Sequence, residues 1–241
     1  MKSTALLVAA IALAGCRPNR PATAPLSLAA AADLNFALDD IAAHYPGQLR
    51  VSYGSSGNLF TQISNGAPFD LFLSADIDFA RRLARSPSDV FRYATGHLVV
   101  WVRGASPLDP ATALRSGDVR HLAIANPLHA PYGRAAEAAL RSMGLWEALQ
   151  PKLVLGENIV QTFQFVDSGA ADAGLVALSL AMAPTARDRG RYWQVPADTY
   201  PRMDQAGVIL KDSPAARAFR DYLLSADGRR ILKQYGFSLP E

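Results

Sequence analysis

The sequence predicts an α/β protein with mostly parallel sheets and helices on both faces of each sheet. Short apolar runs typical of strands alternate along the chain with segments whose apolar residues recur at helical spacing. Strands that alternate with helices of about 10–15 residues imply βαβ units, and therefore parallel strand pairs. The 241 residues are enough for two small domains or one large one, and the hydrophobic fraction of 50% excludes a disordered chain.

Eight apolar runs predict strands. They cover residues 26–31, 49–53, 71–74, 97–102, 121–125, 153–155, 174–177 and 207–210. After the first run, Leu34, Leu38 and Ile41 are spaced as on one face of a helix, and the segment 135–143 repeats this spacing. Residues 215–224 and 228–235 predict two helices at the C-terminus.

A change in residue composition near residues 98–103 predicts a division into two lobes. The long apolar run there is followed by a Pro/Gly-containing stretch (104–110), and the run at 207–210 follows another polar loop (197–205). We therefore expect a discontinuous first lobe, residues 26–97 plus 204–241, with the second lobe, residues 98–203, inserted into it. Ligands of such α/β lobes bind beyond the carboxyl ends of the strands, where helix N-termini point.

The N-terminus has the features of an export signal. Lys2 precedes an apolar run of about ten residues (5–14), which is signal-peptide length and too short to span a bilayer. The run ends in Leu13-Ala14-Gly15-Cys16, which resembles the lipobox of bacterial lipoproteins and implies cleavage before Cys16 and lipidation of its thiol. We expect a signal peptide at 1–15, a lipid-bearing tether at 16–25 and a body anchored on the periplasmic or cell-surface side of the membrane. An ordinary signal peptide with a chance cysteine is the alternative.

Composition argues against several classes of function. The net charge of +3 gives no ground for a nucleic-acid binder, which would concentrate Lys and Arg in one patch. The single cysteine allows neither an internal disulfide framework nor a Cys-rich metal site. No later run reaches 18 consecutive apolar residues, so no further membrane span is expected.

Four strand-to-helix junctions carry small and polar residues, at 29–35, 53–58, 126–133 and 156–160. The second junction contains Gly54, Ser55, Ser56 and Gly57, which would expose backbone N–H groups and hydroxyls at a helix N-terminus. About half a positive charge is felt there, so this combination suits an oxyanion. A plain turn followed by a helix cap is the alternative for this junction taken alone.

Seven segments form an ordered set: A-A-A-D-L (30–34), Y-G-S-S-G-N (53–58), N-G-A-P-F-D-L-F-L-S-A-D (65–76), G-H-L-V-V-W (96–101), N-P-L-H-A-P-Y-G (126–133), G-A-A-D-A-G-L-V-A-L (169–178) and Y-G-F (235–237). In this order they resemble the extracytoplasmic molybdate-binding proteins of ABC importers. The resemblance implies a type II periplasmic-binding-protein fold, with two lobes joined by a two-strand hinge. It further implies a monomer without catalysis or cofactor, which captures molybdate or tungstate by lobe closure and delivers it to an inner-membrane permease.

The same resemblance implies the binding residues. Ser56, with its neighbour Ser55, matches the position that donates to the oxyanion from the first lobe. Tyr132 matches a donor position of the second lobe, and Ile159 matches an apolar position whose backbone N–H binds.

Two further positions of the implied site, Ala32 and Asp33, depart from the family pattern, which has Ser, Thr or Asn there. An ionised aspartate only accepts hydrogen bonds, and beside a dianion in a low dielectric it would be repelled. Our hypothesis is that Asp33 turns away to cap the following helix and leaves backbone N–H groups of residues 32–33 for the ligand. The alternatives are a shift to another oxyanion such as sulfate or phosphate, or an interaction lipoprotein that has lost oxyanion binding.

An enzyme is the rival class, because His97, His121 and His129 accompany many Ser and Asp residues. The chain has no G-x-S-x-G motif, and the histidines lack the spacing of metal ligands. Two basic clusters, at 81–85 and 229–233, are expected to be solvated helix faces, with docking to a permease or to anionic headgroups as the alternative.

Overall fold

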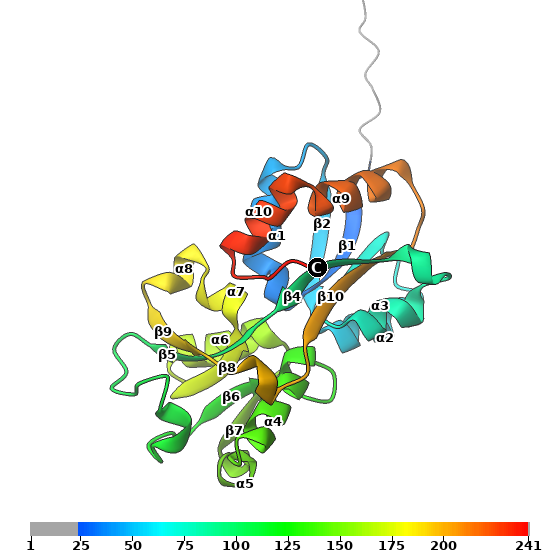
Figure 1. Ribbon diagram of the computed structural model, residues 1–241. Coiled ribbons are helices and arrows are strands. Elements are labelled where there is room, and N and C mark those ends of the chain that lie inside the picture. Colours follow the sequence, from blue (N-terminus) through cyan, green and yellow to red (C-terminus); the bar gives the residue numbers. More distant parts are fainter. Residues whose placement is uncertain (1–23, 241) are drawn as a thin grey trace, which may run out of the picture.

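The computed structural model describes residues 24–240 and contains two five-stranded sheets, each covered by helices (Figure 1). The first sheet has the order β2 (Leu49–Gly54), β1 (Leu26–Ala31), β3 (Leu71–Ser74), β10 (Met203–Ile209), β4 (Val90–Gly96). The second has the order β7 (Leu153–Gly156), β6 (Leu122–Ala125), β8 (Ala173–Ala177), β5 (Leu98–Arg103), β9 (Gly190–Gln194). We call each sheet with its helices the first and the second lobe. The predicted two-lobed α/β fold is confirmed.

Each sheet is mixed, with one strand running against the rest. Strand β1 pairs in parallel with β2 and β3, whereas β10 is antiparallel to both β3 and β4. In the second sheet β6 is parallel to β7 and β8, and β5 is antiparallel to β8 and β9. The two strands that run against the rest, β10 and β5, are each adjacent to a connection through which the chain passes from one lobe to the other.

The chain crosses between the lobes twice, and the two crossings are neighbours. Only His97 separates β4 in the first sheet from β5 in the second. The return path leaves β9 and enters β10 at Met203, which pairs with Gly96 at the end of β4. Figure 1 shows β4 and β10 side by side, running from the first lobe toward the second. Two adjacent connections of this kind allow a hinge movement without breaking either sheet.

Helices cover both faces of the first sheet. On one face α1 (Asn35–His44), α9 (Pro214–Leu224) and α10 (Ala226–Gln234) pack over a core that includes Leu38 and Phe219. On the other face α2 (Ser56–Ser64) and α3 (Ile77–Leu83) bury Leu59 and Ala80 against Phe72. The short helices η1 (Ala32–Leu34) and η2 (Pro87–Asp89) complete this lobe.

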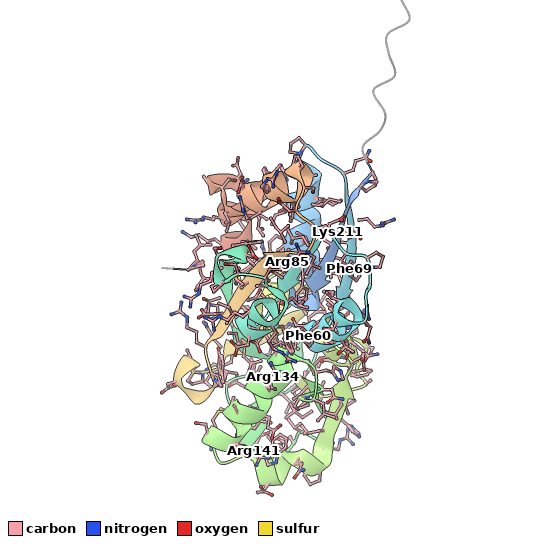
Figure 2. The ribbon with its side chains drawn as sticks, turned by 90° about the vertical axis from the view of Figure 1, so that its right-hand side faces the viewer. Phe60, Phe69, Arg85, Arg134, Arg141 and Lys211 are labelled. Carbon is pink, nitrogen blue, oxygen red and sulfur yellow. The ribbon has the colours of Figure 1, made fainter. Side chains whose placement is uncertain are left out.

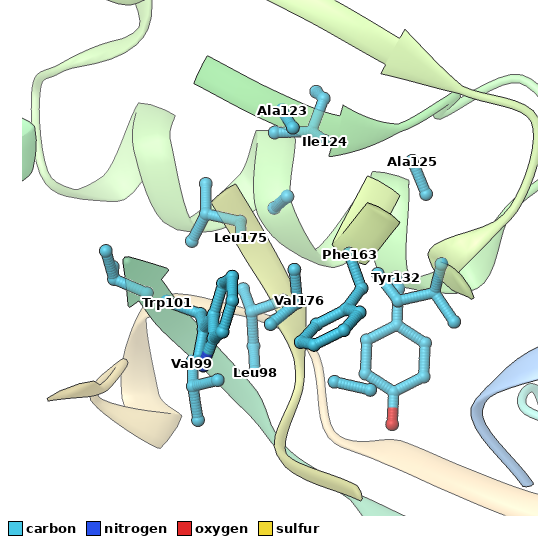
Figure 3. Packing of buried hydrophobic residues seen from close by; sticks show 14 of the residues in the cluster. Leu98, Val99, Trp101, Ala123, Ile124, Ala125, Tyr132, Phe163, Leu175 and Val176 are labelled. Atoms are coloured by element: carbon cyan, nitrogen blue, oxygen red, sulfur yellow. The ribbon is translucent and has the colours of Figure 1, made fainter. Parts of the chain in front are cut away.

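The second lobe is built around Trp101, which is fully buried in strand β5. Its indole packs on Phe163 of α6 (Ile159–Ser168), with ring centroids 4.6 Å apart (Figure 3). The remaining helices of this lobe are α4 (Pro131–Ser142), α5 (Trp146–Leu149), α7 (Leu178–Ala181), α8 (Pro184–Arg187), η3 (Ala113–Arg115), η4 (Gln150–Lys152) and η5 (Ala197–Thr199). Within residues 24–240, no helix is long and apolar enough to span a membrane. The predicted signal peptide and Cys16 lie outside the described residues.

The structure corrects the strand prediction in three places. Strands β4 and β9 were not predicted, because polar residues such as Arg92 and Arg191 interrupt their apolar pattern. Strand β10 begins at Met203 rather than at residue 207, so Asp204 and Gln205 belong to a strand and not to a polar loop. This half of β10 lies between the lobes, where a buried polar residue can find a partner.

Candidate functional site

A small cavity lies between the two lobes, and all six residues that the sequence predicted for an anion site line it. Its lining comprises Ala31, Ala32, Asp33, Gly54, Ser55, Ser56 and Ala75 from the first lobe and Ala130, Pro131, Tyr132 and Ile159 from the second. The six predicted residues are each at most 5% exposed. The cavity volume is about 10 Å³, against about 270 Å³ for the cleft beside it. The space left between the lobes is therefore small and admits only a compact ligand.

The first lobe offers two serine hydroxyls at the start of α2. Strand β2 ends at Gly54 and the helix begins at Ser56, with Ser55 as the N-cap residue. The side chain of Ser55 makes no capping bond, and its Oγ is buried without a hydrogen-bond partner. Ser56 Oγ accepts the N–H of Ala75 at 3.0 Å, which leaves its own proton available for another acceptor. Both hydroxyls can thus donate into the cavity.

The second lobe places the N-termini of two more helices at the cavity. Helix α4 begins with Pro131 and Tyr132, and helix α6 begins with Ile159. The side chain of Asn158 caps α6 by accepting hydrogen bonds from the N–H groups of Val160 and Gln161. The N–H group of Ile159 is therefore not engaged by this cap. The first N–H groups of a helix have no partner within the helix and carry a partial positive charge. With α2, three helix N-termini converge on one cavity, which favours an anion.

Asp33 joins the lobes and does not cap a helix, so the capping hypothesis is wrong. Its Oδ2 accepts the hydroxyl of Tyr132 at 3.0 Å and the side-chain N–H of Gln205 at 2.5 Å. Its backbone carbonyl accepts the hydroxyl of Ser179 at 2.7 Å. The physical reason is burial: Asp33 is 1% exposed, and a carboxylate in that position is drawn to the nearest donors, which the second lobe and β10 supply.

The electrostatics of the site centre on this carboxyl group. Burial raises the pKa of Asp33 from 3.8 to about 6, because the loss of hydration outweighs the hydrogen bonds from Gln205 and Tyr132. Burial and the neighbouring Asp33 raise the pKa of Tyr132 and Tyr93 well above their usual value of 10. The two phenols therefore remain protonated at physiological pH, and Tyr132 remains a donor.

Tyr132 spans the boundary between the lobes. Figure 3 shows its ring in the core of the second lobe and its hydroxyl pointing away from that core. The ring is 2% exposed, so the hydroxyl is held in place by packing. Gly96, at the end of β4, makes room for it, because a Cβ there would lie 2.4 Å from the Tyr132 hydroxyl and 2.7 Å from the Gln205 amide nitrogen.

Three contacts close the rim of the cavity. The N–H of Gly57 donates to the carbonyl oxygen of His129 across the lobes at 2.9 Å. Beside it, the amide of Asn58 donates to the carboxylate of Glu157. On the cleft side, Arg134 of α4 forms an ion pair with Asp76 of the first lobe at 2.5 Å. These contacts hold the two lobes together around the cavity.

Sequence reasoning missed Gln205 and Ser179, the two further partners of Asp33. Gln205 is fully buried in β10, in a stretch assigned to a loop on the grounds of its polarity. Ser179 follows β8 at a strand-to-helix junction like the four that were considered. Ser179 is a polar residue at a strand-to-helix junction, which is the signal used for the other site residues. Gln205 lies within a strand and carries no such local signal.

The histidines do not take part in this site. None of His97, His121 and His129 lines the cavity; His129 instead contacts Glu157 at the rim through Nε2. In the part of the chain that the structure describes, no group of three or more His, Cys, Asp or Glu side chains is placed to hold a metal ion. The cavity offers hydroxyl and backbone donors, which can bind an anion.

Comparison with known proteins gives consistent matches. Residues 26–238 match the family model of bacterial extracellular solute-binding proteins. The chain is 39% identical over 228 residues to the molybdate-binding protein ModA of Azotobacter vinelandii, with 90% of each chain covered. It is 37% identical over 193 residues to ModA of Rhodobacter capsulatus, covering 77% of this chain and 75% of that one. Among solved structures, the periplasmic molybdate-binding protein of Azotobacter vinelandii superposes with a TM-score of 0.83 at 32% identity, covering 90% of this chain and 100% of that one.

Proposed function

Because this chain belongs to the bacterial extracellular solute-binding proteins, we propose that it is the substrate-binding protein of a molybdate ABC transporter and that the interlobe cavity holds the oxyanion. It works outside the cytoplasm and hands its ligand to a membrane permease. The observation that carries the assignment of the site is the buried, unpartnered hydroxyl of Ser55 next to that of Ser56, in a cavity where three helix N-termini meet.

Neutral donors account for both firm and reversible binding. The hydroxyls of Ser55 and Ser56 and the N–H groups of Ala32, Tyr132 and Ile159 can each donate to an oxyanion. Hydrogen bonds to a charged group contribute roughly 1.5–3 kcal/mol each. Several such bonds hold a dianion without a fixed countercharge, and each is exchanged for water when the lobes separate.

Capture follows from the position of the donors on both lobes. We propose the predicted division, residues 26–97 and 204–241 for the first lobe and 98–203 for the second, with the hinge at His97 and at Met203, where β10 begins. An open form exposes the serines, and the anion then recruits Tyr132 and Ile159 as the lobes close. Both halves of the site come from one chain, so no second copy is needed to complete it, and we propose a monomer.

Tungstate is expected to bind in the same way, because it has the same shape and charge as molybdate. Sulfate is smaller, so donors placed for the larger ion would be left with long contacts. Sulfate and phosphate are the second candidates for the ligand, and a lipoprotein that keeps the fold without binding an anion is the third.

Lipid attachment is proposed from the sequence around Cys16, the only cysteine of the chain. A Cys16→Ser variant expressed in a bacterium that processes lipoproteins is expected to lose incorporation of radiolabelled palmitate. Labelling of the variant equal to that of the parent would contradict the assignment.

Thermal unfolding of the purified, dialysed chain tests the ligand. A ligand at about 1,000 times its dissociation constant stabilises the folded state by roughly 4 kcal/mol, which is a readily measured rise in Tm. Molybdate and tungstate are expected to give this rise, and equal concentrations of sulfate and phosphate little or none. A rise with sulfate or phosphate alone would transfer the function to that anion, and no rise with any of the four would leave only the third candidate.

Replacing Ser56 with alanine is expected to weaken molybdate binding about 10- to 100-fold. The variant loses one donor to the anion, worth roughly 1.5–3 kcal/mol, while the acceptor of the Ala75 N–H is lost from the free and the bound protein alike. The matched control is Ser64→Ala, at the exposed end of the same helix, which should bind as the parent does. Equal affinities of the two variants in isothermal titration calorimetry would remove Ser56 from the site.

Replacing Arg134 with alanine is expected to weaken binding less than about fivefold. Its ion pair with Asp76 crosses between the lobes, but the Arg134 side chain is 42% exposed, and such pairs contribute at most about 1 kcal/mol. Arg141→Ala is the control, because its ion pair with Glu137 lies within α4; Figure 2 shows it farther along the helix from the first lobe. Stopped-flow release of molybdate should be faster for Arg134→Ala only. A loss of molybdate affinity above about tenfold would contradict this expectation and show that the ion pair is required to hold the lobes closed.

A further inference from the structure

Two buried polar atoms among the residues that line the cavity have no partner, and their chemistry is opposite. Ser55 Oγ carries a proton and can donate. Asp33 Oδ1, when ionised, can only accept, and its twin Oδ2 already accepts from Tyr132 and Gln205. A ligand that satisfies both atoms must therefore present an acceptor oxygen and also a proton.

No positive charge neutralises Asp33 within the site. The elements packed around its side chain supply Tyr132 from α4, Tyr93 from β4 and the amide of Gln205 from β10, and Tyr200 lies next to Tyr132. Ser179 of α7 contacts only its backbone carbonyl. None of the eleven lining residues is Lys, Arg or His. Burial raises the pKa of all three phenols, so within this group only Asp33 titrates near neutral pH.

We infer that the oxyanion is bound together with one proton, which lies between Asp33 Oδ1 and an oxygen of the ligand. The inference rests on the proposed function and concerns the same site. The free dianion and one proton from solvent enter the cavity together, and no covalent bond within the protein or between metal and oxygen changes. The proton converts the repulsion between two anions into a hydrogen bond, while Tyr132 and Gln205 stay on Oδ2.

This arrangement makes Asp33 a specificity-determining residue. Molybdate and tungstate are oxyanions basic enough to share a proton with a buried carboxyl group. Sulfate is a far weaker base, so it would accept a weaker hydrogen bond from the proton on Asp33 Oδ1. Asp33 thus adds selection by basicity to selection by size.

Titration calorimetry of the full chain with sodium molybdate in two buffers of different ionisation enthalpy, at the same pH near 7.5, counts the protons taken up. We expect close to one proton per molybdate for the parent. Uptake of one proton lowers the association constant about tenfold for each unit of pH above the pKa of the free carboxyl. For Asp33→Asn we expect no uptake and an association constant that does not change with pH. Asn keeps an oxygen for Tyr132 and Gln205 and replaces Oδ1 by a donor.

Ser55→Ala is the matched control, because it lines the same cavity but carries no titrating group. It should weaken molybdate binding and still take up one proton. Sulfate titrations give a second readout, in which Asp33→Asn should bind sulfate more tightly than the parent by about tenfold or more. An unchanged sulfate affinity would contradict the selection by basicity.

The outcomes separate this inference from the function on which it rests. Molybdate binding by the parent without proton uptake, and with the same pH dependence as Asp33→Asn, overturns the inference and leaves the function intact. Binding by Asp33→Asn but not by the parent overturns the inference and the proposed function of the parent chain, since the ionised carboxyl would then exclude the anion from a cavity that can otherwise hold it. Absence of binding by the parent and by Asp33→Asn overturns the proposed function and the inference together.

Discussion

Replacing Gly57 with alanine is expected to weaken molybdate binding at least about 100-fold. A Cβ at this position would lie 2.5 Å from the carbonyl oxygen of His129 and 2.9 Å from its Cα. Both atoms belong to the backbone of the opposite lobe, so the clash is relieved only when the lobes move apart. The donors of Tyr132 and Ile159 would then no longer reach the anion, and the loss of two bonds to a charged group costs about 3 kcal/mol or more.

Calorimetry and small-angle scattering with saturating molybdate would test this prediction. Gln62→Ala is the control, since Gln62 is exposed on the same helix. The Gly57→Ala variant should stay expanded where the control becomes compact. An affinity within a few-fold of the parent would show that the Gly57–His129 contact is not needed for closure.

The ligand-free Asp33→Asn variant is expected to be more stable than the parent by up to about 3 kcal/mol at pH 7. Burial holds the pKa of Asp33 near 6 in the folded protein, against 3.8 as the ordinary value. Between these two values the unfolded chain has lost the proton that the folded chain keeps. The free energy of unfolding therefore falls as pH rises from about 4 to 6, and it stays lower above pH 6. A difference of about two pKa units corresponds to the stated 3 kcal/mol.

Urea unfolding of both proteins at a series of pH values from 4 to 8 would measure this difference. The two curves should converge near pH 4 and separate toward pH 6, with the parent less stable. Asp172→Asn is a useful contrast, because backbone N–H groups of Arg120 and His121 lower the pKa of Asp172. Its removal should destabilise the protein above pH 4. Parallel curves for the parent and Asp33→Asn would mean that the Asp33 carboxyl ionises as it does in the unfolded chain.

The sequence was informative wherever the signal was local. The strands at the centre of each sheet are apolar runs, and the junction after β2 combines Gly and Ser in a way that marks a helix N-terminus. Those patterns, with the family resemblance, led to six of the eleven residues that line the cavity. The lobes were also foreseeable, because one extended run is followed by a polar stretch and another follows a polar loop.

The contacts of Asp33 could not be predicted in this way. Its partners Tyr132 and Gln205 lie 99 and 172 residues away along the chain. Gln205 is buried only because β10 runs between the lobes, so its polarity was taken as a sign of a loop. The position of Asp33 suggested an N-cap, which is the usual role of Asp before a helix. In the structure its carboxylate instead accepts hydrogen bonds from residues that are distant in the sequence.

The central claim is that a single oxyanion sits between the serines of α2 and the N-termini of α4 and α6. Crystals grown with molybdate, measured at an X-ray energy where molybdenum scatters anomalously, would test it most directly. The account predicts one strong anomalous peak per chain, with ligand oxygens within hydrogen-bond distance of Ser56 Oγ and the N–H of Ile159. A well-ordered structure whose anomalous peak lies elsewhere, or which shows none at saturating molybdate, would contradict it.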